Sequence, residues 1–249
     1  MNTKKLEIFC DFDGTITVGD TVDLLLEKLA LPEWEALEEL WQKGEISSGE
    51  CMTKQISLIQ GGWPAVEKVL DTVAVDRGLA SFVVWCRQQK VAFNIVSDGL
   101  DQVIKKLLTR EKVSVDALWS NHLIEAEDGS LSLEIPAREH RVVCETGRCK
   151  CQVLDMAGSD KLKVVIGDGR SDYCWARNAD ILFAKDSLLN HCLKQGIPCI
   201  PYESLVEVRV ALQDMLMTEV ASTGITEEQD TEHYIGTPTT WGGAQVITG

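Results

Sequence analysis

The chain has 249 residues, of which 45% are hydrophobic and 25% charged, and its formal net charge is -15 at pH 7. This length and composition suit one sizeable α/β domain, or a core domain with a small inserted one, and exclude a disordered or fibrous protein. The acidic charge argues against a nucleic-acid partner, because binding to a phosphate backbone requires a basic face.

The N-terminus and the cysteine content favour a cytoplasmic protein. Residues 1–6 lack the apolar segment of a signal peptide, and no apolar run approaches membrane-spanning length. Nine cysteines, an odd number, without an export signal indicate reduced thiols rather than disulfides. We therefore expect a cytoplasmic monomer or homodimer with no membrane partner.

The first predicted element is a short buried strand at residues 6–10, an apolar run that stops at Asp11. In open α/β sheets, ligands bind at the carboxyl ends of such strands. From about Asp20 to Asp76 the apolar residues recur at helical spacing, which predicts four short helices and no strand. Ser47 and Glu50 match a capping box at the start of one of them.

After Gly78, helical and strand patterns alternate. We predict helices at 78–89 and 102–109, after Lys150, near Cys174, and after Ser187 and Ser204, with strands at 91–96, 119–125, 131–135, 162–166 and 181–184. Such alternation predicts an α/β fold with a Rossmann-like, mostly parallel sheet that is covered by helices on both faces.

The position of the all-helical stretch predicts the domain organisation. We expect an α/β core domain from residues 1–18 and 78–217, with a helical cap domain inserted at 19–77. Residues 218–249 are rich in Thr, Gly and Glu without periodicity, so we expect a flexible or loosely docked tail there.

Four patches at strand ends or helix starts supply the residue types that phosphoryl transfer needs. They are Asp11-Phe12-Asp13-Gly14-Thr15, Ser97-Asp98-Gly99, Lys150, and Gly167-Asp168-Gly169-Arg170-Ser171-Asp172. Taken singly, most of these patterns mark only a turn or a helix cap. Their order after successive strands is what predicts one phosphoryl-transfer site.

Chemistry suggests a role for each acidic residue. Asp11 is the candidate nucleophile, since a carboxylate attacks phosphorus once a divalent cation offsets the repulsion between two anions. Asp13 can protonate the leaving group and then deprotonate water. We assign a Mg²⁺ cofactor to the Asp11 carboxylate, the Asp13 backbone carbonyl and Asp168. Asp172 can ligate the ion or orient Lys150.

Phosphate binding is assigned to Ser97, to the backbone N–H groups around Asp98 and Gly99, and to Lys150. Lys161 and Lys163 lie nearby in sequence and are alternatives to Lys150. Asp20 and Asp23, close after the first patch, are expected at the entrance of the site.

Two other features favour structural roles. Cys149 and Cys151 lack a second pair at zinc spacing, so we expect reduced packing cysteines. The Trp-bearing helical stretch at 34–41 is expected to form the core of the cap rather than to contact a substrate.

Together the four patches resemble the phosphatases of the haloacid dehalogenase superfamily, in its phosphoserine phosphatase-like branch, up to about residue 215. Four segments are similar to the bacterial methionine-salvage phosphatases of this branch: Phe9–Thr17, Pro32-Glu33-Trp34, Cys149-Lys150-Cys151 and Phe183–Asn190. The resemblance implies a small phosphorylated metabolite as substrate, with 2-hydroxy-3-keto-5-methylthiopentenyl 1-phosphate as the leading choice. It also implies that Asp20 contacts the substrate.

Two departures from this branch bear on the choice of ester. The second patch reads Ser-Asp-Gly where Ser-Gly-Gly is expected, and the fourth reads Gly-Asp-Gly-Arg-Ser-Asp rather than Gly-Asp-Ser-x-x-Asp. Phosphoserine, phosphoethanolamine, phosphocholine and pyridoxal phosphate are therefore alternative substrates. A mutase or phosphotransferase and, from another class, a phospho-accepting signalling domain also fit the acidic residues.

Overall fold

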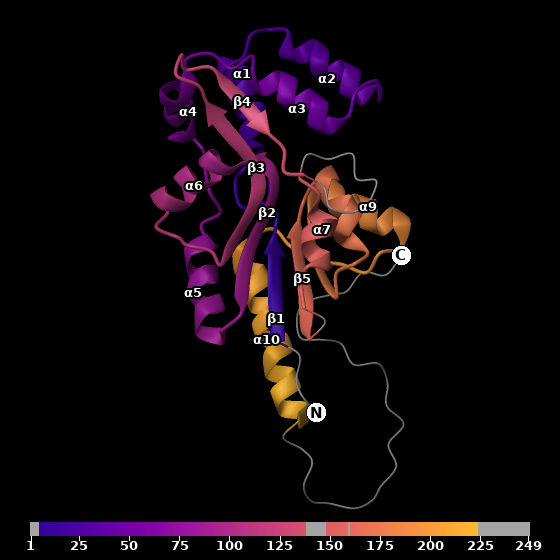
Figure 1. Cartoon of the computed structure of the whole chain (residues 1–249). Helices are drawn as coiled ribbons and strands as arrows, with labels where there is room; N and C mark the ends of the chain where they lie inside the picture. The colour runs from indigo at the N-terminus through magenta and orange to yellow at the C-terminus, as the bar shows by residue number, and fades with distance from the viewer. Residues whose placement is uncertain (1–4, 138–147, 159, 224–249) are drawn as a thin grey trace, which may run out of the picture.

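The computed structural model describes residues 5–137, 148–158 and 160–223 (Figure 1). Its strands are β1 (Lys5–Cys10), β2 (Ala92–Leu100), β3 (Ala117–Glu125), β4 (Leu131–Glu134), β5 (Lys161–Gly167), β6 (Ile181–Ala184) and β7 (Ile200–Pro201). They form one sheet in the order β4-β3-β2-β1-β5-β6-β7. Only the β3–β4 pair is antiparallel, so the expected mostly parallel α/β fold is confirmed.

Helices precede, separate and follow the strands. They are α1 (Thr21–Leu29), α2 (Trp34–Gln42), α3 (Ser48–Ile56), α4 (Gly62–Leu70), α5 (Leu79–Gln89), α6 (Asp101–Arg110), α7 (Lys150–Asp155), α8 (Tyr173–Ala176), α9 (Asp186–Gln195) and α10 (Leu205–Thr223), with a 3-10 turn η1 (Arg170–Asp172). No helix in the described part of the chain is long and apolar enough to cross a membrane.

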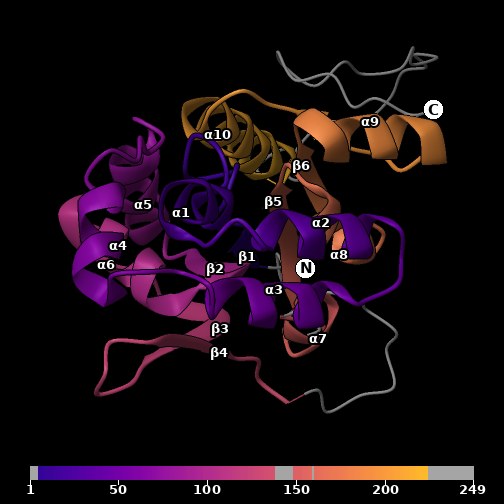
Figure 2. The ribbon, with the colours of Figure 1, turned by 90° about the horizontal axis from the view of Figure 1, so that it is seen from above.

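The sheet is buried on both faces, because alternate residues of its central strands belong to different core clusters. Ile8 of β1 packs in a cluster with residues of α5, α6 and α10, whereas its neighbour Phe9 packs with residues of α7, α8 and α9. Val164 and Val165 of β5 divide in the same way. The view from above shows these helices on opposite sides of the strands (Figure 2).

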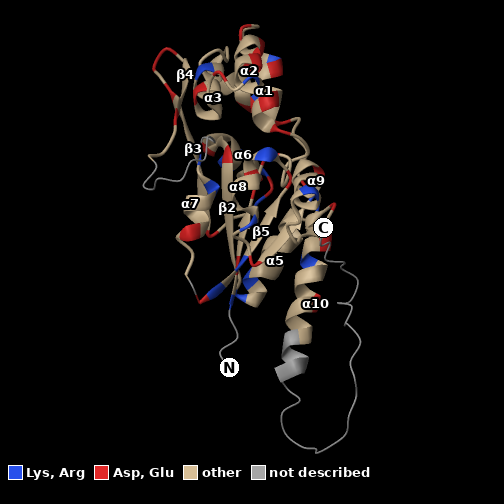
Figure 3. Ribbon diagram, turned by 90° about the vertical axis from the view of Figure 1, so that its right-hand side faces the viewer, with Lys and Arg blue, Asp and Glu red and all other residues tan. Residues whose placement is uncertain are grey.

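Helices α1–α4 lie together beyond the carboxyl ends of the strands (Figure 1). The capping box of Ser47 and Glu50 is confirmed at the start of α3. Asp20 caps α1 by accepting hydrogen bonds from the N–H groups of Val22 and Asp23. Acidic residues are frequent on α1 and α2, above the core (Figure 3).

The two connections to this helical segment are joined to each other. The Val18 N–H donates to the Ala74 carbonyl at 2.9 Å, and the Asp76 N–H donates to the Ile16 carbonyl at 2.8 Å. At the end of α4, the Arg110 guanidinium of α6 donates to the carbonyls of Leu70 and Val73, each at 2.8 Å. These hydrogen bonds therefore attach the helical segment to the core at a fixed position.

Two details differ from the sequence-based expectations. The two-residue strand β7 has no predicted counterpart, because two residues are too short to show a periodic pattern. Helix α10 continues to Thr223, past residue 218 where the tail was expected to begin. Residues 224–249 lie outside the described part of the chain, and the division into core and cap domains stays a prediction.

We predict that Arg110→Met lowers the free energy of unfolding by about 1–2 kcal/mol, because two backbone carbonyls lose a charged donor. Urea unfolding followed by circular dichroism would measure this change. Arg177→Met is the matched control, since among the described residues the exposed Arg177 guanidinium donates only to Gln195, at 3.5 Å. Equal losses in the two variants would contradict a specific role for Arg110.

Candidate active site

The candidate site lies where the central strand β1 ends. Asp11 follows β1 directly, and its N–H donates to the Ile166 carbonyl of β5 at 2.9 Å. Strand β2, on the other side of β1, carries Ser97 near its end. Ends of parallel strands meet at one edge of the sheet, so residues separated by more than 150 positions become neighbours.

A buried ion-pair network joins three of the four patches. The Lys150 ammonium is 2.8 Å from Asp11 Oδ1, 2.7 Å from Asp172 Oδ1 and 2.9 Å from Ser171 Oγ, and its side chain is fully buried. Burial alone would lower the pKa of Lys150, but the two carboxylates raise it above its usual value. Lys150 is therefore a permanent cation in contact with the candidate nucleophile.

The two alternative lysines lie elsewhere. Lys161 begins β5, at the end of that strand opposite to Gly167, and pairs with Glu7 at 3.1 Å. Lys163 is two residues further along the same strand. Among these three lysines, Lys150 is the one that contacts Asp11.

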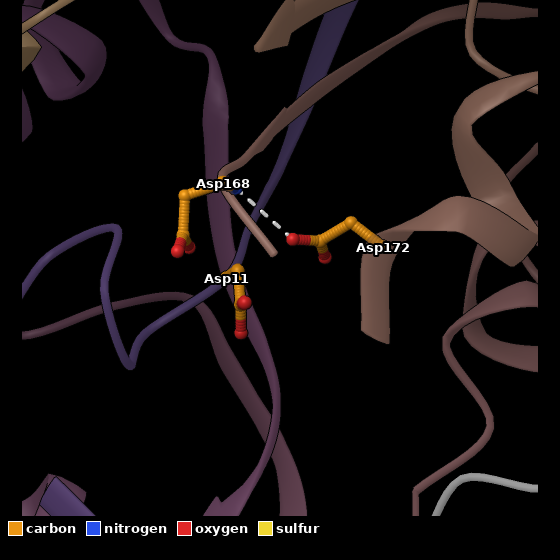
Figure 4. Close-up of side chains that lie close together, drawn as sticks. All are labelled: Asp11, Asp168 and Asp172. Carbon is orange, nitrogen blue, oxygen red and sulfur yellow. Dashed lines mark hydrogen bonds between the residues drawn. The ribbon is translucent and has the colours of Figure 1, made fainter. Parts of the chain in front are cut away.

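Asp11, Asp168 and Asp172 form an acidic triad (Figure 4), in which one carboxylate oxygen of each lies within 4.8 Å of the others. Oxygen donors at this spacing suit a hard divalent cation. Asp172 is already engaged: its Oδ2 accepts from the N–H groups of Asp168 and Gly169, each at 3.1 Å. Asp168 and Asp11 are thus more available than Asp172 to bind a cation, and Asp172 orients the loop that carries Asp168.

Burial and neighbouring carboxylates raise the pKa values of two members of the triad, Asp11 and Asp168. Burial raises the pKa of Asp11, and Asp172 adds to this effect, whereas Lys150 opposes it. Burial also raises the pKa of Asp168 to about 6, although a 2.6 Å hydrogen bond from Thr15 Oγ1 works in the other direction. Carboxylates held together in this way gain most from a bound cation.

The Asp13 carboxylate contacts residues outside the triad. Its Oδ1 accepts hydrogen bonds from the Thr21 N–H at 2.9 Å and from the Thr21 hydroxyl at 2.5 Å, and its Oδ2 accepts from Ser97 Oγ at 3.4 Å. Burial and the nearby Asp20 raise the pKa of Asp13 to about 7. A carboxyl group that titrates near neutrality suits both donation and removal of a proton.

The second patch forms a tight turn around Ser97. Ser97 is buried, and its hydroxyl accepts a hydrogen bond from the Gly99 N–H at 2.9 Å. A Cβ atom on Gly99 would collide with Asp13 Oδ2, and one on Gly14, where φ is +73°, would collide with Asp168. Glycine at both positions lets the acidic loops approach each other closely.

The Asp98 side chain has a contact that the sequence did not indicate. Its Oδ1 accepts from the Arg148 N–H at 2.5 Å, and its backbone carbonyl accepts from Asn121 Nδ2 at 2.6 Å. A carboxylate repels phosphate, so only the backbone of this residue is suited to phosphate binding. The side chain instead joins the Ser97 turn to the residues that lead into α7 and Lys150.

A cavity of about 490 Å³ opens above these residues, within the size range of small-molecule sites. Asp11, Asp13, Ser97 and Asp168 lie among its core-side lining residues. The helical segment supplies the opposite wall, which consists of Asp20, Val22, Asp23, Glu38, Trp41, Ser48, Cys51, Met52 and Gln55. Asp20 and Asp23, which were expected near the entrance, are part of this lining.

The expectation for the Trp-bearing helix was wrong for Trp41, whereas Trp34 is partly buried against the main core cluster, as expected. No residue of α2 is buried, and Trp41 lines the cavity, where the Arg170 guanidinium lies 5.1 Å from its ring centre. Thr21, Ser171, Trp41 and Arg170 were all missed as site residues. The sequence pointed to Ser171 and Arg170 only through their place in the fourth patch. It gave no indication of Trp41 and Thr21, because their contacts depend on the tertiary fold.

Comparison with known proteins shows the family. The haloacid dehalogenase-like hydrolase family matches residues 8–177. A 2-hydroxy-3-keto-5-methylthiopentenyl-1-phosphate phosphatase of Geobacillus kaustophilus (strain HTA426) is 32% identical over 222 residues, which cover 86% of this chain and 98% of that protein.

Two solved structures share the fold. A substrate-bound phosphoserine phosphatase is 20% identical with a TM-score of 0.62, covering 83% of this chain and 97% of its own. A phospho-aspartyl intermediate analogue of phosphoserine phosphatase is 21% identical, also with a TM-score of 0.62, covering 83% of this chain and 98% of its own.

We predict that Asp98→Gly lowers the free energy of unfolding by about 1–2 kcal/mol and reduces the rate of phosphate release, because the Arg148 N–H loses its acceptor and Lys150 is held less firmly. Urea unfolding and hydrolysis of p-nitrophenyl phosphate would measure both. Asp98→Asn, which keeps an acceptor oxygen, should retain most of both properties. Equal behaviour of the two variants would contradict this positioning role.

Proposed function

The chain belongs to the haloacid dehalogenase-like hydrolases and is a phosphatase of that family, and we propose that its substrate is 2-hydroxy-3-keto-5-methylthiopentenyl 1-phosphate. The observation that carries the choice of ester is the 32% identity to a phosphatase of that name, over nearly the full length of both chains. The reaction itself rests on the buried contact between Lys150 and Asp11.

We assign the nucleophile to one atom of Asp11. Its Oδ1 accepts from the Phe12 N–H at 2.7 Å and contacts Lys150, whereas its Oδ2 has no donor among the described residues. Oδ2 is therefore free to attack phosphorus in line with the leaving oxygen. The phosphorus–oxygen bond to the alcohol breaks as the bond to Asp11 forms, which leaves an aspartyl-phosphate.

Protons move through Asp13. In the first step its carboxyl group protonates the leaving alkoxide, and in the second the resulting carboxylate takes a proton from the water that hydrolyses the aspartyl-phosphate. Thr21 fixes one oxygen of Asp13, so the other oxygen, beside Ser97, is the one aimed at the reacting group. Ser97, the Gly99 turn and Lys150 bind the phosphoryl oxygens.

Mg²⁺ fits the acidic triad, and when bound it supplies positive charge that offsets the repulsion between the substrate phosphate and these carboxylates. Asp11 and Asp168 would hold it, together with the Asp13 backbone carbonyl, while Asp172 orients the loop and Lys150. The raised pKa values of Asp11 and Asp168 agree with this assignment, because crowded carboxylates favour a neighbouring cation.

The alternatives carry less support. The phosphoserine phosphatase structures are about one-fifth identical to this chain and share its fold alone. A phospho-accepting signalling role does not fit a family of hydrolases. We also infer a cytoplasmic location, where thiols stay reduced, since all eight cysteines among the described residues are free.

We predict that kcat/KM falls as the pH rises above about 7, because Asp13 must be protonated to act as the acid and its pKa is about 7. Ionisation removes the donor, so the decline should approach tenfold per pH unit. Asp13→Asn should have a far lower rate and no such decline. A profile of wild-type shape in that variant, measured by phosphate release between pH 5 and 9, would assign the titration to another group.

The central experiment is a panel of esters tested with Mg²⁺: the methylthiopentenyl ester, phosphoserine, phosphoethanolamine, phosphocholine and pyridoxal phosphate. We expect the first to have the highest kcat/KM, and we expect Asp11→Asn to lose at least about a thousandfold with every ester while retaining a native circular dichroism spectrum. A better ester would change the substrate assignment only. Wild-type-like rates in Asp11→Asn would overturn the mechanism.

A further inference from the structure

The mouth of the cavity contains a contact between the core and the helical segment. Arg170 belongs to the loop after β5, between Asp168 and Asp172, whereas Trp41 lies on α2. The guanidinium carbon is 5.1 Å from the centre of the Trp41 ring, and both residues line the cavity. From above, α2 overlies the part of the core that carries this loop (Figure 2).

Among the described residues that line the cavity, Arg170 is the sole lysine or arginine. The other cation of the site, Lys150, is fully buried and is already bound to Asp11 and Asp172. Within the described part of the chain, the Arg170 side chain takes part in no hydrogen bond or ion pair, and it is exposed. Its five N–H donors are thus available to a bound ligand.

Stacking on Trp41 leaves those donors usable. A guanidinium is planar, and its N–H bonds point outward in its plane, so its face can rest on an aromatic ring while its edge donates hydrogen bonds. An ammonium group has no such geometry. Trp41 can therefore hold Arg170 at the cavity mouth without consuming its hydrogen-bonding capacity.

The opposite wall limits the charge of the leaving alcohol. Asp20, Asp23 and Glu38 line it, and α1 and α2 carry further acidic residues (Figure 3). Partial burial, followed by repulsion from Asp20 and Glu38, raises the pKa of Asp23 to about 6. A leaving alcohol with an additional negative charge would be repelled by this wall.

Apolar surface lies beside the donors. Trp41, Cys51 and Met52 line the cavity on the helical segment. Aromatic and sulfur-containing side chains favour an apolar or thioether group. The cavity thus presents hydrogen-bond donors near the mouth and an apolar surface next to them, in a setting that disfavours anions.

We propose that Arg170, held over Trp41, selects the leaving alcohol by donating hydrogen bonds to its uncharged carbonyl or hydroxyl oxygens, while the apolar end of the alcohol packs against Trp41 and Met52. This inference rests on the proposed function and deepens it, because the methylthiopentenyl ester carries a hydroxyl, a keto group and a methylthio end. It makes Arg170 a specificity-determining residue for the reaction at Asp11.

The test uses two three-carbon esters that differ in oxygen content, dihydroxyacetone phosphate and propyl phosphate. For wild type we expect the higher kcat/KM with the oxygenated ester. In Arg170→Met the ratio of the two kcat/KM values should fall by about tenfold or more, the effect of losing one hydrogen bond to a charged group. Arg177→Met, a nearby exposed arginine outside the cavity lining, should leave the ratio unchanged.

A second set of variants tests the role of the ring. Trp41→Leu should lower the same ratio, and the double variant Arg170→Met with Trp41→Leu should lose less than the product of the two single losses, because both changes remove one arrangement. Independent effects that multiply would contradict the claim that Trp41 acts by holding Arg170.

Three results would overturn the inference. An equal fall for both esters in Arg170→Met would mean that the contact only holds the helical segment to the core. A wild-type enzyme without preference for the oxygenated ester would remove the selection itself. If phosphoethanolamine were the best substrate of the wild type, and its kcat/KM increased further in Arg170→Met, the acidic wall rather than Arg170 would select the alcohol. If the three-carbon pair behaves as expected but the methylthiopentenyl ester is not hydrolysed, the proposed substrate fails and the role of Arg170 stands.

Discussion

The site depends on one interaction, the buried ammonium of Lys150 between two carboxylates. A charge removed from water is costly unless it is paired and hydrogen-bonded, and Lys150 is fully buried with Asp11, Asp172 and Ser171 as its partners. The pairing requires the end of β1, the start of α7 and the turn after β5 to meet at one point. The same contact opposes the rise that burial causes in the pKa of Asp11, and so favours the ionised state in which a carboxylate can attack phosphorus.

The parallel sheet brings these segments together at one edge, and backbone hydrogen bonds fix the shape of the loop that follows β5. Adjacent β2, β1 and β5 deliver Ser97, Asp11 and Asp168 at one edge. Within the last loop, Asp172 accepts from the N–H groups of Asp168 and Gly169, so the residue that fixes Lys150 also shapes the loop that presents Asp168. Loss of the Asp172 carboxylate would therefore disturb both the Lys150 ammonium and the acidic triad.

Periodic patterns and local motifs made most of the fold and the central residues predictable. The apolar run before Asp11 and the order of the four patches depend on residues close in sequence, and the structure brings Asp11, Asp13, Ser97, Lys150 and Asp168 together. Contacts between distant segments were not predictable: Thr21 holding Asp13, Asp98 reaching the Arg148 N–H, and Trp41 lying against Arg170. An amphipathic pattern does not say whether an aromatic residue faces a core or a cavity.

The position of Arg170 links the choice of ester to the chemistry. It lies two residues from both Asp168 and Asp172, so a single short loop carries the proposed metal ligand, the partner of the buried lysine and the donor that we propose for the leaving alcohol. Trp41, which contacts Arg170, lies on the helical segment, and Arg110 of the core donates hydrogen bonds to the end of that segment. A change in α2 can then alter which alcohol is accepted without moving Asp11, whereas a change in the loop affects selection and reaction together. Substrate preference in this chain should for that reason diverge more easily through the helical segment than through the loop.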